Sequence, residues 1–229
     1  MMQIIEGQEF SSFYDDRSGR VFEDLEFRHC TFISSAVSIT QDPRLRATIR
    51  NVKLVKCEAR ACSLSAIVED VLVDGLNSNH SNVSYASVFK HVTLRGPLGT
   101  LRVLALMDYN PEPAVQQEFD QANAAYYATV DWALDISEAE FTELNLRGVP
   151  ARLVRRDPAT QVVVTREKAL AGKWRTLDLS GTYWPRSLED MLERNAADVV
   201  LAAPKRGRRY GQFLKGLRIL RDAGVAEPD

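Results

Sequence analysis

Cysteine is scarce in this chain, with only Cys30, Cys57 and Cys62 among 229 residues. Three cysteines cannot form the disulfide framework of a small secreted protein, so we expect reduced thiols in a cytoplasm. Long apolar runs are also missing, and none approaches the roughly 20 residues needed to span a bilayer. The N-terminus has no basic region and reaches a charge at Glu6, too early for a secretory signal. These absences predict a cytoplasmic protein without a membrane partner.

An excess of one charge sign is missing as well. Lysine and arginine total 29 against 31 aspartate and glutamate residues, which gives a net charge of −2. This balance predicts no bulk attraction to nucleic acid or to an anionic membrane. A Gly-rich phosphate loop, a Gly-x-Ser-x-Gly motif and a His-Glu-x-x-His motif are also absent from the sequence. We therefore predict no catalytic residue and no cofactor, and expect the protein not to be an enzyme.

What the sequence does contain is an apolar pattern that repeats every five residues. Phenylalanine occurs at positions 22, 27 and 32, and Leu25 and Cys30 precede the last two by two positions. Residues 47–66 and 134–151 keep the same rhythm of paired apolar residues. The pairs in these two blocks are Ala47/Ile49, Val52/Leu54, Cys57/Ala59, Cys62/Leu64, Leu134/Ile136, Ala139/Phe141, Leu144/Leu146 and Val149/Ala151. Shorter matches are Ala66/Val68, Val71/Val73, Val92/Leu94, Leu177/Leu179 and Thr182/Trp184.

A period of five is neither the 3.6 of a helix nor the 2.0 of a flat strand. It is typical of a chain that makes a short extended step, turns a corner and repeats. Two apolar residues separated by one polar residue point the same way in a strand, and polar pairs such as Arg28-His29 would occupy the corners. Four such units make one square coil, and stacked coils would satisfy each other's backbone groups.

The best units resemble those of the pentapeptide-repeat family. They include Leu134-Asp-Ile-Ser-Glu138, Ala139-Glu-Phe-Thr-Glu143 and Leu144-Asn-Leu-Arg-Gly148, with Leu177-Asp-Leu-Ser-Gly181 further on. The resemblance implies an all-β solenoid, a right-handed quadrilateral β-helix. Several small inner positions hold Leu or Val instead, and the frame slips between blocks, so we expect distorted coils.

The segments without the rhythm predict the domain organisation. We expect the β-helix within residues 1–184, with insertions near 33–46, 77–87, 101–133 and 152–173. Within these insertions, the sequence predicts a helix from Pro111 to about Tyr127 and a strand or hairpin at Val162-Val163-Val164. Residues 185–229 predict a helical C-terminal cap or dimerisation segment. Its helices are expected from Ser187 to about Ala197 and from Gly207 to about Ala223, the second with an apolar stripe.

The residues that could take part in catalysis or metal binding are better explained as structural or solvated. All three cysteines fall on inner small positions, where a thiol behaves as a small apolar group. His29, His80 and His91 fall at or near corners without other ligands at zinc spacing. A cluster of acidic residues could bind calcium or cleave a polysaccharide, but it occupies the variable outer positions. Its members are Asp131, Asp135, Glu138, Glu140 and Glu143. We therefore predict no metal site.

Charge is segregated along the chain. One basic block comprises Arg44, Arg46, Arg50, Lys53, Lys56 and Arg60. Another comprises Lys205, Arg206, Arg208, Arg209, Lys215, Arg218 and Arg221. Acidic residues gather at 22–26, 69–74 and 135–143. Some proteins of the family protect DNA gyrase through an acidic surface that resembles duplex DNA, but the first basic block would interrupt such a surface here. We also expect no nucleic-acid partner for the basic tail.

These observations favour a bacterial-type, non-enzymatic scaffold that binds another protein. The resemblance supplies no functional residue, because the family's functions lie on variable outer faces. A homodimer through the C-terminal helix is a further expectation. Two alternative functions stay open: a DNA-mimicking protein for gyrase protection or self-resistance, and a β-helix polysaccharide lyase or hydrolase.

Overall fold

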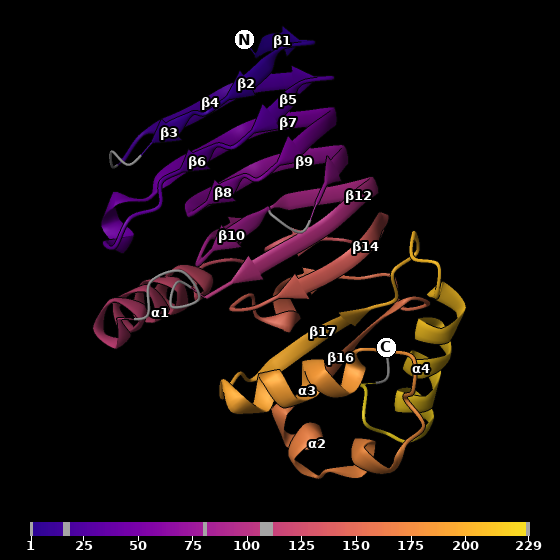
Figure 1. Cartoon of the computed structure of the whole chain (residues 1–229). Coiled ribbons are helices and arrows are strands. Elements are labelled where there is room, and N and C mark those ends of the chain that lie inside the picture. The colour runs from indigo at the N-terminus through magenta and orange to yellow at the C-terminus, as the bar shows by residue number, and fades with distance from the viewer. Residues whose placement is uncertain (1, 16–18, 80–81, 106–111, 228–229) are drawn as a thin grey trace.

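A computed structural model describes residues 2–15, 19–79, 82–105 and 112–227. Within these residues the chain is mostly parallel β-sheet with small helices, an arrangement compatible with a solenoid. Figure 1 shows the strands stacked one beyond the next, from β1 at the N-terminal end to β14, with the C-terminal residues at the far end of the stack. Fifteen strands form this curled sheet, and two further strands form a separate small sheet.

Among the described residues, the curled sheet contains short strands and five longer ones, β4, β7, β9, β12 and β14, that run through more than one five-residue unit. In chain order they are β1 (Gln3–Glu6), β2 (Glu9–Ser11), β3 (Tyr14–Asp15), β4 (Val21–Arg28), β5 (Thr31–Ile33), β6 (Ala36–Val37), β7 (Ala47–Arg60), β8 (Ser63–Leu64), β9 (Ala66–Ser78), β10 (Val83–Tyr85), β11 (Val88–Lys90), β12 (Val92–Leu104), β13 (Leu134–Asp135), β14 (Ala139–Leu146) and β15 (Val154–Arg155). Two short 3-10 helices, η1 (Pro43–Leu45) and η3 (Ala151–Leu153), and the helix α1 (Pro113–Tyr127) interrupt them.

Parallel pairing aligns the apolar residues of successive strands into ladders. Phe27 of β4 lies opposite Leu54 of β7, which lies opposite Val73 of β9. Val73 in turn lies opposite Leu94 of β12. A one-residue slip would turn each of these side chains to the other face of its strand, so burial of one face fixes the register. The second residue of each apolar pair was predicted to face inward, and the residues of this ladder do.

The corners of the curled sheet also recur every five residues. Positive φ angles occur at Asp24, His29 and Ser34, again at Asn51, Lys56 and Ala61, and again at Ala86, His91 and Gly96. All but the last are non-glycine residues, which adopt this left-handed region only where the surrounding structure imposes it. The parallel strands on either side of each corner supply that constraint. The polar corner predicted at Arg28-His29 is confirmed, since His29 has a φ of 51°.

Two predicted insertions contain strands that the sequence pattern did not reveal. Residues 77–87 were expected to be a loop, but they include the end of β9 and all of β10, in which Val83 pairs with Ser63. Residues 33–46 include β6 as well as the 3-10 helix η1. These segments are extended because their neighbours in the stack offer backbone partners, although their own side chains are mostly polar or small. By contrast, the helix expected in the third insertion is present as α1.

The C-terminal unit begins earlier than the sequence predicted. It contains β16 (Gln161–Thr165), α2 (Arg166–Leu170), η4 (Lys173–Thr176), α3 (Trp184–Glu193), β17 (Asp198–Ala202) and α4 (Tyr210–Asp222). The strands β16 and β17 pair antiparallel, and the helices pack a second apolar core around Trp184 and Leu217. Leu179 and Trp184, expected in the last repeat units, belong to this second core. The expected boundary after residue 184 therefore falls inside a packed unit.

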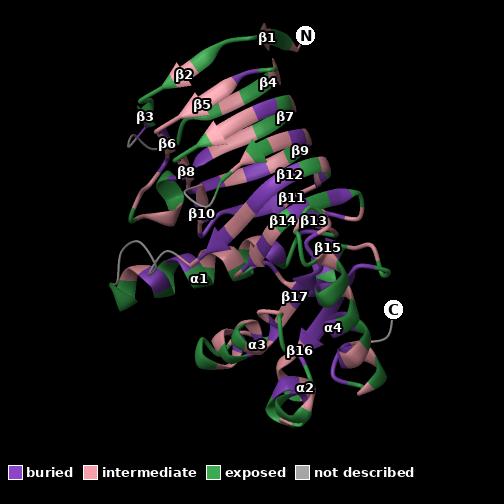
Figure 2. Cartoon of the chain, turned by 45° about the vertical axis from the view of Figure 1, so that its right-hand side comes forward, coloured by how far each residue is buried: buried purple, intermediate pink, exposed green. Residues whose placement is uncertain are grey.

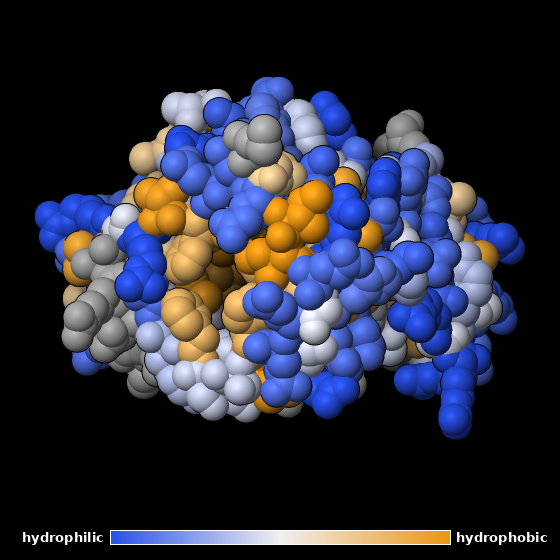
Figure 3. All heavy atoms as spheres, turned by 90° about the horizontal axis from the view of Figure 1, so that it is seen from above, coloured by the Kyte–Doolittle hydropathy of each residue, from blue (hydrophilic) through white to orange (hydrophobic). Residues whose placement is uncertain are grey.

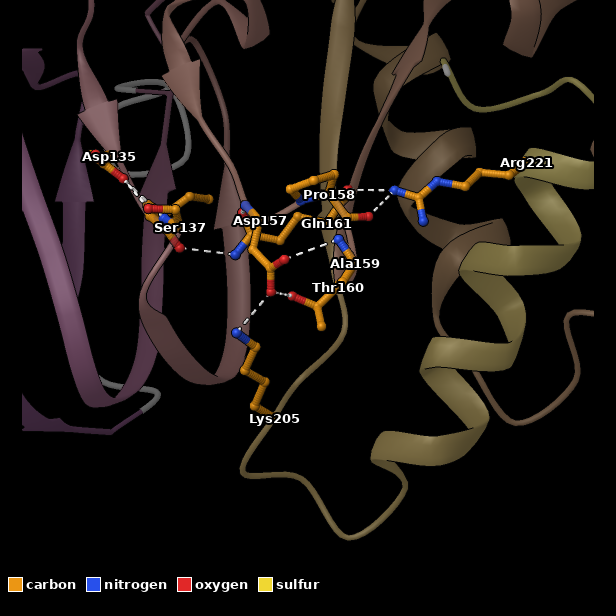
Figure 4. A network of polar contacts seen from close by, with 10 residues as sticks. Asp135, Ser137, Asp157, Pro158, Ala159, Thr160, Gln161, Lys205 and Arg221 are labelled. Carbon is orange, nitrogen blue, oxygen red and sulfur yellow. Dashed lines mark hydrogen bonds and ion pairs between the residues drawn. The ribbon is translucent and has the colours of Figure 1, made fainter. Parts of the chain in front are cut away.

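A polar network joins this C-terminal unit to the stack (Figure 4). The Gln161 amide nitrogen donates to the Ile136 carbonyl at 2.9 Å, and the Gln161 side chain is almost fully buried. Asp157 accepts hydrogen bonds from the Thr160 hydroxyl at 2.7 Å and from the Lys205 ammonium at 3.0 Å. Burial alone would raise the pKa of Asp157, but these hydrogen bonds and the charge of Lys205 outweigh it and hold the pKa below 3.8.

Burial is uneven along the stack. Figure 2 shows buried residues concentrated in the later strands and at the junction with the C-terminal unit, whereas the first strands are mostly half-buried or exposed. Phe141 of β14 is 2% exposed, but Tyr14 of β3 is 68% exposed. The stack is therefore packed at one end and open at the other.

Substitution of Phe141 by Asp should unfold the curled sheet, because it buries an unpaired carboxylate in the apolar interior. We expect a loss of more than about 4 kcal/mol in the free energy of unfolding, measured by urea denaturation with circular dichroism. Leu146→Asp should behave in the same way. The control is Thr142→Asp, which adds the same group to the exposed side of β14 and should change stability by less than about 0.5 kcal/mol. A stable, soluble Phe141→Asp protein would contradict the interior assignment.

The junction network predicts a pH-dependent contribution from Asp157. A carboxyl whose pKa is lowered on folding stabilises the protein above the unfolded pKa, and this stabilisation disappears as pH falls through the folded value. Asp157→Asn should therefore cost about 1 kcal/mol at pH 7, and the difference from wild type should shrink below pH 3.8. Urea denaturation at several pH values measures both. Glu140→Gln, on the exposed side of β14, serves as the control, and an equal pH effect there would contradict the prediction.

Candidate functional site

The two ends of the curled sheet differ. At the far end, the C-terminal unit covers the last strands, and the Arg206 backbone N–H donates to the Phe141 carbonyl at 3.2 Å. At the N-terminal end, β1, β2 and β3 pair with β4, β5 and β6 on one side, and no described residue pairs with their other side. An unpaired strand edge can accept a further strand from another chain. The N-terminal edge is therefore the first feature of the candidate site.

The hydrogen bonds between β2 and β5 show which backbone groups of β2 face the free edge. The Gln8 carbonyl accepts from the Thr31 N–H at 2.9 Å, and the Ser12 N–H donates to the Ile33 carbonyl at 3.0 Å. Because backbone groups of neighbouring residues in a strand point in alternate directions, the N–H groups of Glu9 and Ser11 point away from β5. These two residues offer backbone groups to a partner strand.

An apolar cavity of about 490 Å³ lies inside the curl. Figure 3, a view onto the N-terminal end, shows a hollow lined by hydrophobic side chains and surrounded by hydrophilic ones. The lining comes from strands along much of the stack rather than from a single loop. It includes Phe10, Phe22, Leu25, Ile49, Val52, Val68, Val71, Val73, Leu76, Phe89, Leu94 and Leu134. This volume lies in the range of small-molecule binding sites, which are about 300–1,000 Å³.

Aromatic rings gather at the open end of this cavity. Five of the nine phenylalanines of the chain lie between positions 10 and 32, and all five line the cavity. Phe10 stacks on Phe32 with ring centroids 5.4 Å apart, and Phe27 meets both rings edge-on. Phe13 and Phe22 form a separate edge-on pair at 6.4 Å. These rings give the open end a large apolar surface with defined geometry.

Three polar side chains in the lining hydrogen-bond to the backbone or to another serine. Asn82 donates to the Ala59 carbonyl at 2.7 Å, and its carbonyl oxygen accepts from the Cys62 N–H at 2.8 Å. Ser84 donates to the Ser87 hydroxyl at 2.7 Å. Ser78 donates to the Thr100 carbonyl at 2.5 Å. Because these groups already have partners, the cavity presents mainly hydrocarbon to whatever enters it.

The three cysteines occupy this interior or its edge, as the sequence predicted. Cys30 and Cys57 are buried, and burial raises the pKa of the Cys57 thiol above its ordinary value. The Cys57 thiol donates to the Phe27 carbonyl at 3.4 Å, one strand away. Cys62 is half-buried and lines the cavity. No disulfide links them, and their positions agree with a role in packing.

The two described histidines belong to no metal-binding group. His29 is exposed at its corner, and His80 lies outside the described residues. His91 lies between Asp70 and Asp131, with ring nitrogens 3.1 and 2.7 Å from their carboxylate oxygens. The hydrogen bond from His91 lowers the pKa of Asp131. Among the described residues, no group of three or more His, Cys, Asp or Glu side chains is arranged to hold a metal ion.

The members of the acidic cluster differ in exposure and in hydrogen bonding. Glu138 and Glu140 are exposed, whereas Asp135 is half-buried and accepts from the Ser137 hydroxyl at 2.6 Å (Figure 4). Glu143 is also half-buried, and Asp131 is engaged with His91 as described above. Within the described residues, the cluster therefore contains no group of three or more carboxylates that could hold a calcium ion.

The first basic block is not a single surface. Arg46 is buried: its guanidinium donates to the Ala86 carbonyl at 3.0 Å and to the Asn123 side chain of α1 at 2.7 Å. Burial lowers its pKa from the ordinary value. Arg50 pairs with Glu23 at 2.5 Å on the neighbouring strand. Basic and acidic residues that are far apart in the sequence thus partly lie beside one another in the folded chain.

The C-terminal basic block likewise supports internal structure. Lys205 pairs with Asp157, the Arg209 guanidinium donates to the Gly181 carbonyl at 3.0 Å, and Arg221 donates to the carbonyls of Pro158 and Gln161. The apolar stripe of α4, including Phe213 and Leu217, is buried in the second core. The chain itself therefore covers the apolar stripe that was predicted as a possible homodimer interface.

No protein-family model, curated protein or solved structure matches the chain. The resemblance to pentapeptide-repeat proteins therefore stays a prediction from the residues quoted above. In addition, none of the helices in the described ranges is both long and apolar enough to cross a membrane.

Sequence reasoning missed the open end and the cavity. Many apolar residues that line the cavity, such as Leu54 and Val73, were correctly placed inside, whereas Phe10, Phe13 and Phe89 were not among the predicted pairs. Inward direction also does not reveal whether an interior is filled. The one available signal was the concentration of phenylalanine between residues 10 and 32.

Two phenylalanine truncations test whether the N-terminal interior is open. Phe141→Ala removes a ring packed on all sides and should cost about 3–5 kcal/mol. Phe27→Ala removes a half-buried ring beside the cavity and should cost less than about 2 kcal/mol, because less packing is lost there. Both values come from urea denaturation of the purified variants. Equal losses at the two sites would show that the N-terminal interior is closed and tightly packed.

Proposed function

We propose that residues 3–155 form a right-handed, four-sided β-helix of the pentapeptide-repeat type. The five-residue spacing of left-handed corners supports this proposal. So does the interval between paired residues, because a coil of four five-residue units would advance the chain by 20. Ile49 pairs with Val68, 19 residues on, and Val73 pairs with Leu94, 21 residues on. The longer interval between Phe22 and Ile49 leaves room for the segment that contains η1.

The β-helix acts as a non-enzymatic scaffold that binds another protein at its N-terminal edge. The observation that carries this proposal is the contrast between the two ends: the chain covers the far end itself, whereas no described residue pairs with the second side of β1 or β2. Natural proteins usually protect such an edge. Exposed apolar side chains lie on the same edge, with Ile4 54% exposed and Phe13 38% exposed. An extended segment of a partner can pair with this edge and cover these side chains.

The alternative functions receive less support from the described geometry. A DNA-mimicking surface needs a continuous array of unpaired carboxylates, but Asp74 pairs with Arg95 at 2.8 Å and Glu58 pairs with Arg60 at 2.8 Å. A polysaccharide-cleaving site needs two available carboxylates, whereas in the acidic cluster Asp131 is engaged with His91 and Asp135 with Ser137. The scaffold is therefore the function that we put forward.

A proline at position 9 tests the edge. Glu9→Pro removes an N–H that points to the free edge, and edge positions of this kind tolerate proline. Glu9→Ala is the matched control, because it removes the same side chain but keeps the N–H. In affinity capture from a lysate of the source cells, wild type and Glu9→Ala should retain the same partner, and Glu9→Pro should lose it by at least about tenfold.

Circular dichroism and melting temperature should show that both variants are folded. If Glu9→Pro, folded as wild type, captures the partner as well as Glu9→Ala does, the partner binds elsewhere. If no protein is enriched over a control resin by wild type, the scaffold proposal fails.

A further inference from the structure

The cavity inside the curl poses a question that the scaffold proposal does not answer. Protein interiors are normally packed to the density of organic crystals, with few voids larger than a water molecule. Here about 490 Å³ is unfilled by the chain, and the surface that its lining presents is almost entirely apolar. An apolar cavity gives water few hydrogen-bond partners, and even a much smaller one can take up an apolar molecule.

We propose that this cavity is a binding site for a small apolar molecule that carries no negative charge. The molecule enters through the open N-terminal end and lies against the ladders of β4, β7, β9 and β12. Its apolar body contacts Phe27, Leu54 and Val73, which line the cavity at successive levels of the stack. The proposal concerns the interior of the curl, so it does not depend on the protein partner at the edge.

The lining determines the chemistry of the body of the ligand. The side chains of Asn82, Ser78 and Ser84 around the cavity are engaged with the backbone or with another serine, as shown above. A ligand group that needs several hydrogen bonds would therefore lose those it makes with water and gain few in return. A hydrocarbon chain or an aromatic ring loses nothing polar and gains dispersion contacts with the phenylalanine cluster at the mouth.

The charges at the open end determine what the head of the ligand can be. Residues 2–15, which form the terminal strands, contain Glu6, Glu9 and Asp15 but no lysine or arginine. Arg102 also lines the cavity, but it belongs to β12 and not to the terminal strands at the mouth. Glu6 and Glu9 are exposed on β1 and β2. Arg20, in the next segment, lies 3.8 Å from the Asp15 carboxylate. A negatively charged head group at the mouth would meet these carboxylates, whereas a neutral or cationic one would not be repelled.

Fluorescence of N-phenyl-1-naphthylamine, an uncharged apolar dye, tests the site on the purified full-length protein. We expect saturable binding of one dye molecule per chain. Decan-1-ol and decylamine should displace the dye, and decanoate, with a tail of the same length, should do so roughly fivefold less well. Absence of saturable binding would overturn the proposal. Displacement by decanoate that equals displacement by decylamine would overturn its charge selectivity.

Two neighbouring substitutions locate the dye. Val73→Phe places a ring in the cavity, and Leu72→Phe places the same ring on the opposite side of β9, which does not line the cavity. Dye affinity should fall about tenfold in Val73→Phe and change by less than about twofold in Leu72→Phe. Equal affinities in two folded variants would overturn the proposal. The competition series on wild type decides the question if Val73→Phe does not fold.

The edge variant separates this proposal from the scaffold. Glu9→Pro changes the free edge of β2 and leaves the cavity-lining side chains in place, so it should bind the dye as wild type does. Loss of dye binding in folded Glu9→Pro would place the dye at the edge and overturn an interior site. Dye binding without any captured protein partner would support the cavity and contradict only the scaffold.

Discussion

Parallel pairing of each strand with the next one in the stack is the interaction on which the rest of the structure depends. Strands such as β3 and β8 have only two residues, too few to be stable alone. They are extended because the strands beside them in the stack satisfy their backbone groups. The same pairing holds non-glycine residues such as Asp24 and Asn51 in left-handed corners. Local preference alone would form neither the strands nor the corners.

This dependence explains which parts of the fold could be predicted from the sequence. The inner residues of β7 and β14 were predicted because apolar side chains must recur with the corners. The strand β10 was missed because its pairing comes from β8 and β12, and its own residues carry little apolar pattern. The extent of the C-terminal unit was missed because Thr165 pairs with Asp198, far away in the sequence. A local pattern contains no information about such a partner.

The candidate site shows a second limit of sequence reasoning. Val52, Leu54 and Val73 were predicted to face inward, and they do. Whether inward side chains meet across a curled sheet depends on their volumes and on the width of the curl, which the five-residue pattern does not encode. The free edge could not be predicted either, because a strand has the same sequence pattern whether one or both of its sides are paired. Filled core and binding cavity thus look alike in a sequence.

The uneven ends of the stack have a consequence for biosynthesis. A chain leaves the ribosome from its N-terminus, so β1 to β14 emerge before residues 161–227 that cover the last strands. During that interval both ends of the nascent stack present unpaired backbone groups, and aggregation competes with folding. Translation of the C-terminal unit closes one end. The N-terminal edge of the stack is thus left for the cell to protect, and a molecular chaperone would meet it first.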